Sequence, residues 1–140
     1  AIILACAGLE RLGLQERIRA ELKPDAWWPA VAQGAIAVES LAAKPEITAL
    51  FVALNDKPTE LRVRAERAMN KALHGSCQVP VAAYAEIHGD AMRLTGWVGD
   101  ATNIRSISAN AEGPAREPET LGHNVADMLF AQGAAELLNI

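Results

Sequence analysis

Residues 79–98 read VPVAAYAEIHGDAMRLTGWV, and this stretch decides the fold of the C-terminal half of the chain. Residues 79–87 and 91–98 are rich in β-branched and aromatic side chains, which predicts two strands. The three residues between them, His88-Gly89-Asp90, are typical of a tight turn. A third run at 104–111 has the same character. The pattern predicts a three-stranded antiparallel meander.

Helical periodicity flanks these strands on both sides. Before them, Pro58 is placed to open an amphipathic helix, and Gly75 is the expected C′ residue that ends it. Charged residues of this helix, including Glu66, are expected to face solvent or a ligand. After the strands, a helical period returns from Leu121 to the end. Residues 56–140 are therefore predicted to form an α+β domain whose sheet is covered by helices.

Residues 1–55 lack the elements of a complete domain. Residues 2–5 form an all-apolar run typical of a strand buried in an α/β sheet, with Cys6 expected in the same core. Residues 35–39 predict a second strand. Parallel strands need neighbours that this segment does not supply, so we expect the remaining strands to lie upstream in a longer protein. Helical spacing predicts two short helices within 9–22 and one helix over 45–55.

The composition argues against several classes of function. Of the 140 residues, 51% are hydrophobic and 21% are charged, which is typical of a folded globular protein. The net charge of -4 argues against a nucleic-acid partner, and no apolar stretch predicts a membrane-spanning helix. The two cysteines, Cys6 and Cys77, lie far apart and outside any metal-ligand spacing, so neither a disulfide nor a metal site is predicted.

Cys77 is the best candidate for a functional side chain. It lies in GSCQVP, residues 75–80, between the predicted helix and the first strand, where small neighbours leave room beside the sulfur. His74 and the arginines of the preceding helix would stabilise a thiolate if they approach it. The alternative is that Cys77 only fills space as a small hydrophobic residue. Position and composition leave both interpretations open.

Four stretches of the sequence resemble one known family. They are IILACAGLERLG at 2–13, PAVAQGA at 29–35, LRVRAERAMN at 61–70 and GSCQVP at 75–80. All four are similar to stretches of the hydroxymethylbilane synthases, or porphobilinogen deaminases, and occur in the same order. The resemblance covers the whole chain, but members of that family are roughly twice as long. The chain therefore resembles their C-terminal half.

The resemblance implies an enzyme of porphyrin and haem biosynthesis. Such an enzyme joins four porphobilinogen molecules head to tail into 1-hydroxymethylbilane and releases ammonia at each step. It implies a dipyrromethane cofactor, held by a thioether to Cys77, from which the oligopyrrole chain grows. It also implies a cytoplasmic monomer without a metal, whose catalytic residues lie in the upstream half, so residues 1–140 alone are expected to be inactive. The rival interpretations are a non-catalytic binding module with a structural Cys77, and self-association through exposed apolar faces.

Four further site residues follow from the resemblance. Arg11 is expected to bind the carboxylates of the substrate, and its alternative role is that of a solvated helix arginine. Ala5, Gln33 and Gly34 match segments that line the cofactor cleft, and structural hinge roles explain them equally well.

The resemblance also implies a division of the chain. Residues 1–28 are expected to end domain 2, residues 29–55 to form a hinge and a return segment of domain 1, and residues 56–140 to form domain 3. The first two segments would be an α/β fragment from the end of a two-domain core like that of periplasmic binding proteins. Ala32 and Ser76 depart from the family, since glycine is usual at both positions. The change at Ala32 matters if φ is positive there.

Overall fold

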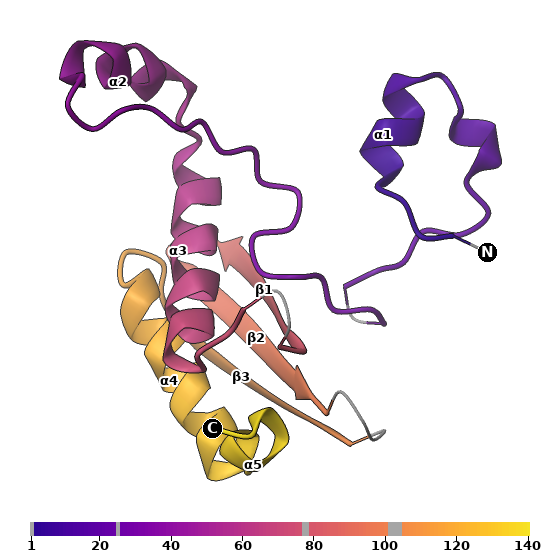
Figure 1. The fold of residues 1–140 in the computed structure, drawn as a ribbon, viewed down its shortest axis with the longest axis vertical. Coiled ribbons are helices and arrows are strands. Elements are labelled where there is room, and N and C mark those ends of the chain that lie inside the picture. Colours follow the sequence, from indigo (N-terminus) through magenta and orange to yellow (C-terminus); the bar gives the residue numbers. More distant parts are fainter. Residues whose placement is uncertain (1, 25, 77–78, 101–104) are drawn as a thin grey trace.

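The computed structural model describes residues 2–24, 26–76, 79–100 and 105–140. Its C-terminal part has two layers, a three-stranded sheet and a layer of helices that covers one face of the sheet (Figure 1). Two segments of the N-terminal part extend away from this domain and are joined by irregular chain (Figure 1). Residues 2–24 are called the first excursion and residues 36–55 the second. The α+β domain expected in the C-terminal half is thus present.

The sheet is an antiparallel meander in the order β1-β2-β3. In its register, Tyr84 opposes Thr95, and Thr95 opposes Asn110 on the other side. Gly89 supplies the positive φ, +61°, that the turn between the first two strands requires. The three strands are β1 (Val81–His88), β2 (Ala91–Gly99) and β3 (Ser106–Pro114). The predicted meander is confirmed, although residue 104, the first of the third predicted run, lies outside the described residues.

Helix α3 (Lys57–Ala72) precedes the sheet and begins where the sequence indicates. Asp56 is its N-cap, and its side chain accepts a hydrogen bond from the backbone nitrogen of Thr59 at 2.9 Å. Pro58 stands in the first turn, where its missing N–H costs no helical hydrogen bond. A polar cap and a first-turn proline therefore fix the start of this helix.

The C-terminal end of α3 differs from the expectation. The N–H of His74 donates to the carbonyl of Lys71, and the N–H of Gly75 donates to the carbonyl of Asn70 at 2.8 Å. These two hydrogen bonds form a Schellman motif, in which C′ is left-handed. His74, with φ of +53°, occupies C′, and Gly75 follows it. The prediction of Gly75 as C′ was wrong because the helix ends one residue earlier.

Helix α4 (Pro118–Ala131) packs beside α3 on the same face of the sheet, and α5 (Ala134–Leu138) follows it. Gly122 permits the close approach of α3 and α4, since a Cβ there would lie 2.5 Å from the carbonyl oxygen of Ala65. Among the described residues, no buried side-chain nitrogen or oxygen lacks a hydrogen-bond partner. The fully buried large side chains are Met69, Leu73, Met92, Leu94, Val98, Pro118, Val125 and Leu129.

The N-terminal half contains helices but not the expected strands. Residues 2–5 and 35–39 are not strands, because no described strand lies beside them to complete a ladder of hydrogen bonds. Cys6 begins a helix and is partly exposed, so its expected place in a strand core was wrong. The expected helices are present as α1 (Cys6–Arg11), η1 (Gln15–Arg17), α2 (Pro45–Phe51) and η2 (Val52–Leu54).

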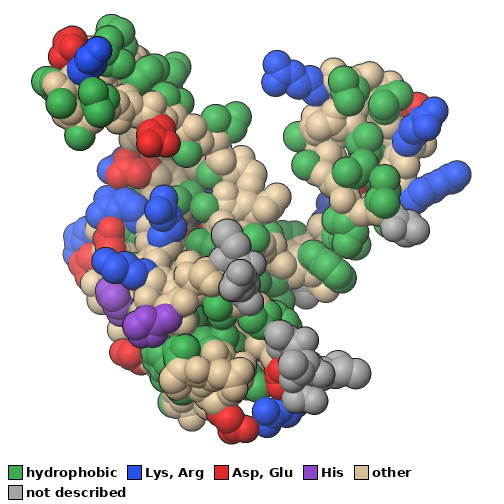
Figure 2. Space-filling view, in the orientation of Figure 1, with side chains coloured by type: hydrophobic (Ala, Val, Ile, Leu, Met, Phe, Trp, Pro, Cys, Tyr) green, Lys and Arg blue, Asp and Glu red, His purple; other side chains and the backbone are tan. Residues whose placement is uncertain are grey.

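Apolar side chains are unusually exposed in this half. Ile2 is 82% exposed and Ile36 is 95% exposed, whereas the apolar side chains that face α3 and α4 from the sheet are buried. Figure 2 shows hydrophobic side chains on the surface of both N-terminal excursions. In the parts of the chain that the structure describes, no helix is both long and apolar enough to cross a bilayer.

Candidate functional site

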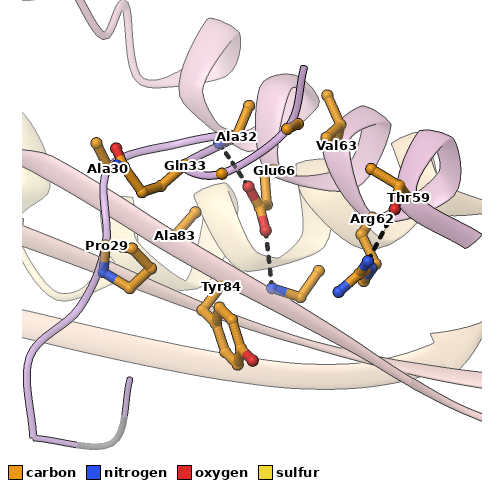
Figure 3. A pocket seen from close by; sticks show the side chains of 13 residues that line it. Pro29, Ala30, Ala32, Gln33, Thr59, Arg62, Val63, Glu66, Ala83 and Tyr84 are labelled. Carbon is orange, nitrogen blue, oxygen red and sulfur yellow. Dashed lines mark hydrogen bonds between the residues drawn. The ribbon is translucent and has the colours of Figure 1, made fainter. Parts of the chain in front are cut away.

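Glu66 joins three parts of the structure at one point. It lies on α3, and its carboxylate accepts a hydrogen bond from the backbone nitrogen of Ala32 at 2.7 Å and another from that of Ala85 at 3.0 Å. Ala32 belongs to the irregular segment 29–35, and Ala85 belongs to β1. Figure 3 shows Glu66 pointing from α3 into the space between this segment and the strand. The carboxylate therefore connects segment 29–35 to the C-terminal domain.

The segment 29–35 is held against the domain at further points. The carbonyl oxygen of Pro29 accepts a hydrogen bond at 3.3 Å from the backbone nitrogen of Ala83, which lies in β1. Val31 packs against the hydrophobic core. Two residues of this segment have a left-handed backbone, Ala32 with φ of +60° and Gly34 with φ of +83°. The condition attached to Ala32 from the sequence, a positive φ, is met.

A cavity of about 220 Å³ lies beside this connection. Gln33 and Gly34 line it from segment 29–35, and Arg62 lines it from α3, where the guanidinium donates to the hydroxyl of Thr59 at 2.9 Å. Tyr84 lines it from β1 (Figure 3). The cavity thus lies where segment 29–35, α3 and β1 meet.

The environment of Glu66 raises its pKa. Burial opposes ionisation of this carboxyl, which is only 6% exposed, and this effect outweighs the two backbone N–H donors, which favour the charged form. The positive charge of Arg62 lowers the pKa by a smaller amount. The Glu66 pKa therefore stands above its ordinary value, because of desolvation.

A larger groove of about 1310 Å³ runs along α3. At one end it is lined by residues 34–37, and at the other by His74 and Gly75. Basic side chains project into it from successive turns of the helix, and His123 adds to them from α4. Figure 2 shows Lys, Arg and His side chains gathered over α3 and α4. The basic residues on α3 that line the groove are Arg64, Arg67 and Lys71.

Carboxylates neutralise only one end of this groove. Arg64 binds Glu119 through two hydrogen bonds, of 2.6 and 3.0 Å, and also contacts Glu60. Lys57, together with Asn55, lowers the pKa of Glu60 to about 2. Arg67 and Lys71 form no ion pair with any carboxylate of the described residues. The end of the groove near Gly75 is therefore positive, and suits a ligand that carries carboxylates.

The structure separates the predicted site residues into two groups. Gln33 and Gly34 line the cavity, and Gly34 also lines the groove. Ala5 and Arg11 are exposed on the first excursion, before and at the end of α1, and line neither space. Cys77 lies outside the described residues. In the sequence it follows Gly75, a residue of the groove wall, by two positions. Within the described ranges, no His, Cys, Asp and Glu residues cluster as a metal site requires.

Two sequence profiles of one family match the chain. The profile described as "Porphobilinogen deaminase, dipyromethane cofactor binding domain" matches residues 1–49, and that described as "Porphobilinogen deaminase, C-terminal domain" matches residues 60–131. The chain belongs to the porphobilinogen deaminase family. Ala5, Arg11, Gln33 and Gly34 fall in the first match and Cys77 in the second.

Curated porphobilinogen deaminases are similar along the whole chain. One from Stenotrophomonas maltophilia is 56% identical over 140 residues, which is 100% of this chain and 46% of that protein. One from Xanthomonas euvesicatoria is 53% identical over 138 residues, which is 99% of this chain and 45% of that protein. The chain therefore spans a little under half the length of these porphobilinogen deaminases.

Sequence reasoning missed Glu66 as a buried residue. In this porphobilinogen deaminase chain, Glu66 lies next to Ala65 and one turn before Met69, both fully buried, so the side chain faces the sheet rather than solvent. The expectation that Glu66 faces solvent was wrong, whereas its place in the lining of the cavity leaves the expected contact with a ligand as a prediction. The helical position of Glu66, beside this apolar stripe, could have predicted its burial. Its hydrogen-bond partners could not be predicted, because Ala32 and Ala85 are 34 and 19 residues away in the sequence.

Proposed function

We propose that residues 1–140 form the C-terminal part of an enzyme that joins four porphobilinogen molecules head to tail into 1-hydroxymethylbilane and releases ammonia. The observation that carries this proposal is the continuity of the groove along α3. It leads from Gly34 in the stretch matched by the cofactor-binding profile to Gly75, two residues before Cys77. Family membership and a groove beside the candidate anchor support the same function.

The residues that line the groove suit a dipyrromethane attached to Cys77. The groove volume, about 1310 Å³, exceeds the usual size of small-molecule pockets, so two pyrrole rings fit within it. When bound, the dipyrromethane supplies the pyrrole end to which porphobilinogen units are added. Arg67 and Lys71 would pair with its carboxylates, Gly34 would contact it from the hinge segment, and Gln33 would reach it from the adjoining cavity.

Covalent attachment gives a physical advantage to this arrangement. A ligand tethered at Cys77 stays in the groove between successive additions, so each addition replaces a bimolecular encounter with an intramolecular one. The basic side chains of α3 would keep the acidic chain aligned along the groove as it lengthens. In this proposal Cys77 is an anchor, and the proton transfers belong to residues upstream of Ala1.

The domain assignment is part of the proposal. Residues 1–28 would complete domain 2, residues 29–55 would form the hinge and return segment of domain 1, and residues 56–140 would form domain 3. The exposed apolar side chains of the two excursions would then be covered by the region that the relatives carry and this chain does not span. Arg11 and Ala5 would reach the ligand only in that assembly, and residues 1–140 alone would not catalyse.

The experiment that tests the function uses a longer polypeptide, in which the N-terminal region of a relative precedes residues 1–140. Denaturing intact-mass analysis, combined with a colour reaction for pyrroles, should show an addition of two pyrrole units. Peptide mapping should place the addition on Cys77, and the protein should consume porphobilinogen. An unmodified Cys77 in this longer polypeptide would favour the non-catalytic binding module.

The two cysteines provide a matched control. Cys77→Ser should abolish both the added mass and the consumption of porphobilinogen. Cys6→Ser should retain both, because Cys6 is partly exposed on α1 and lines neither the cavity nor the groove. Loss of the added mass in both variants would point to a general folding defect instead of a specific anchor.

A further inference from the structure

We propose that Glu66 is a positioning residue, whose carboxylate holds the backbone of Gln33 and Gly34 at a fixed place relative to α3 and β1. This inference rests on the proposed function, in which Gln33 and Gly34 contact the cofactor and Cys77 anchors it. Cys77 lies in the connection between α3 and β1. A single side chain would thereby hold the wall of the site that segment 29–35 forms against α3 and β1.

The burial of Glu66 gives the first argument. The side chain is 6% exposed, and it accepts hydrogen bonds from the backbone nitrogens of Ala32 and Ala85 instead of from a cation. Burying a carboxylate without a paired charge is costly, and an apolar side chain would serve the core of α3 better. The position of Glu66 is therefore explained by the two backbone donors that it holds and not by core packing.

The positions of those donors give the second argument. Ala32 lies 34 residues before Glu66 in the sequence, and Ala85 lies 19 residues after it. One carboxylate thus fixes two separate main-chain segments to the same helix. The donor at Ala32 is also left-handed, with φ of +60°, a conformation that costs an alanine free energy and needs support from its surroundings.

The few other attachments of the hinge segment give the third argument. The hydrogen bond between Pro29 and Ala83 and the packing of Val31 fix the start of the segment. The hydrogen bonds of Gln33 to Ala30 and of Ala35 to Ala32 are local turns and give no support from the domain. Among the described residues of the C-terminal domain, Glu66 therefore makes the hydrogen bond that lies nearest to Gln33 and Gly34. Loss of this hydrogen bond would let these two residues shift.

Hydrogen exchange on residues 1–140 tests the structural part of the inference. In Glu66→Gln, one carboxylate acceptor becomes an NH2 donor, so one of the two backbone hydrogen bonds is lost. We expect the exchange of the Ala32 N–H to be at least tenfold faster in Glu66→Ala and intermediate in Glu66→Gln. The amides of Met92 and Leu94 report whether the core stays folded. Unchanged Ala32 exchange in both variants, with a folded core, would overturn the inference.

Turnover in the longer polypeptide tests the positioning part. We expect Glu66→Gln to keep the added mass on Cys77 and to lower kcat about tenfold, because small displacements of contact groups reduce rates strongly. Glu86→Gln is the matched control, since Glu86 follows Ala85 on β1 but is exposed. It should leave kcat unchanged. An unchanged kcat in Glu66→Gln, despite faster Ala32 exchange, would overturn the positioning role.

The two proposals fail in different ways. If the unaltered longer polypeptide carries no pyrrole mass on Cys77, the proposed function fails, whatever Glu66 does. If it carries the mass and turns over but Glu66→Gln matches Glu86→Gln in kcat and in Ala32 exchange, only the positioning role fails.

Discussion

The Glu66 carboxylate lies 2.7 Å from the backbone nitrogen of Ala32, and Ala32 is left-handed, with φ of +60°. The residue of segment 29–35 that donates to α3 is therefore also a residue with a strained backbone. The left-handed conformation costs a residue with a Cβ roughly 1–2 kcal/mol, whereas glycine adopts it freely. The structure therefore stores strain beside Gln33 and Gly34.

Ala32→Gly should relieve this strain. Because glycine also gains freedom in the unfolded chain, we expect a net gain of about 0.5–1 kcal/mol in local stability. Amide exchange at Gln33 and Ala35, whose N–H groups donate within this turn, should become roughly two- to fivefold slower. Ala30→Gly is the control, since Ala30 has no positive φ, and it should accelerate exchange. Faster exchange in Ala32→Gly would show that the native backbone there is not strained.

Glu66 and Glu60 should give stability opposite dependences on pH. The pKa of Glu66 is raised above its ordinary value of 4.5, mainly by desolvation, so the folded state binds this proton more tightly than the unfolded state. The contribution of Glu66 to stability is therefore largest at low pH, and falls as pH rises from 4.5 through the folded pKa. Hydrogen bonds from Lys57 and Asn55 lower the pKa of Glu60 to about 2, so its contribution is lost as pH falls from 4.5 towards 2.

Urea unfolding of variants across this pH range separates the two carboxyls. Relative to Glu66→Gln, the unaltered chain should lose free energy of unfolding as pH rises above 4.5. Relative to Glu60→Gln, it should lose free energy as pH falls below 4.5. The opposite pKa shifts would be contradicted if the stability of the unaltered chain, relative to Glu66→Gln and relative to Glu60→Gln, changed with pH in the same direction.

The parts of the fold that sequence predicts well depend on local patterns. The first-turn proline Pro58, the apolar stripe of α3 and the turn at Gly89 lie close to the elements that they define. Residues 2–5 and 35–39 were wrongly predicted as strands because an apolar run forms a strand only beside a hydrogen-bonding neighbour. The same limit applies to the site, since Glu66 meets Ala32 and Ala85 only in three dimensions.

His74→Gly should stabilise the end of α3. His74 is left-handed, with φ of +53°, at a position where glycine is the common residue. We expect a gain of about 0.5–1 kcal/mol in the free energy of unfolding, measured in urea. The matched control is His123→Gly, because His123 lies inside α4, where glycine is a poorer helix former than histidine by about 0.4 kcal/mol. Opposite signs for the same substitution would establish the left-handed cap, and a loss at His74 would refute it.

Gly122→Ala tests the contact between α3 and α4. Alanine favours an exposed helix over glycine by about 1 kcal/mol, so helix propensity alone predicts stabilisation. A Cβ at Gly122 would, however, lie 2.5 Å from the carbonyl oxygen of Ala65 and 2.9 Å from the nitrogen of Met69, and backbone atoms cannot move aside as a flexible side chain can. We expect overpacking to dominate and the free energy of unfolding to fall by about 1–3 kcal/mol.

Gly113→Ala is the control for this overpacking. A Cβ at Gly113 would meet the Cδ1 atom of Leu121 at 3.7 Å, which is an ordinary van der Waals contact, and φ there is not positive. This substitution should change the free energy of unfolding by less than about 0.5 kcal/mol. If Gly122→Ala proved as stable as Gly113→Ala, α3 and α4 would have to separate freely. The groove wall that contains Arg67, Lys71 and His123 would then not be rigid, because it spans both helices.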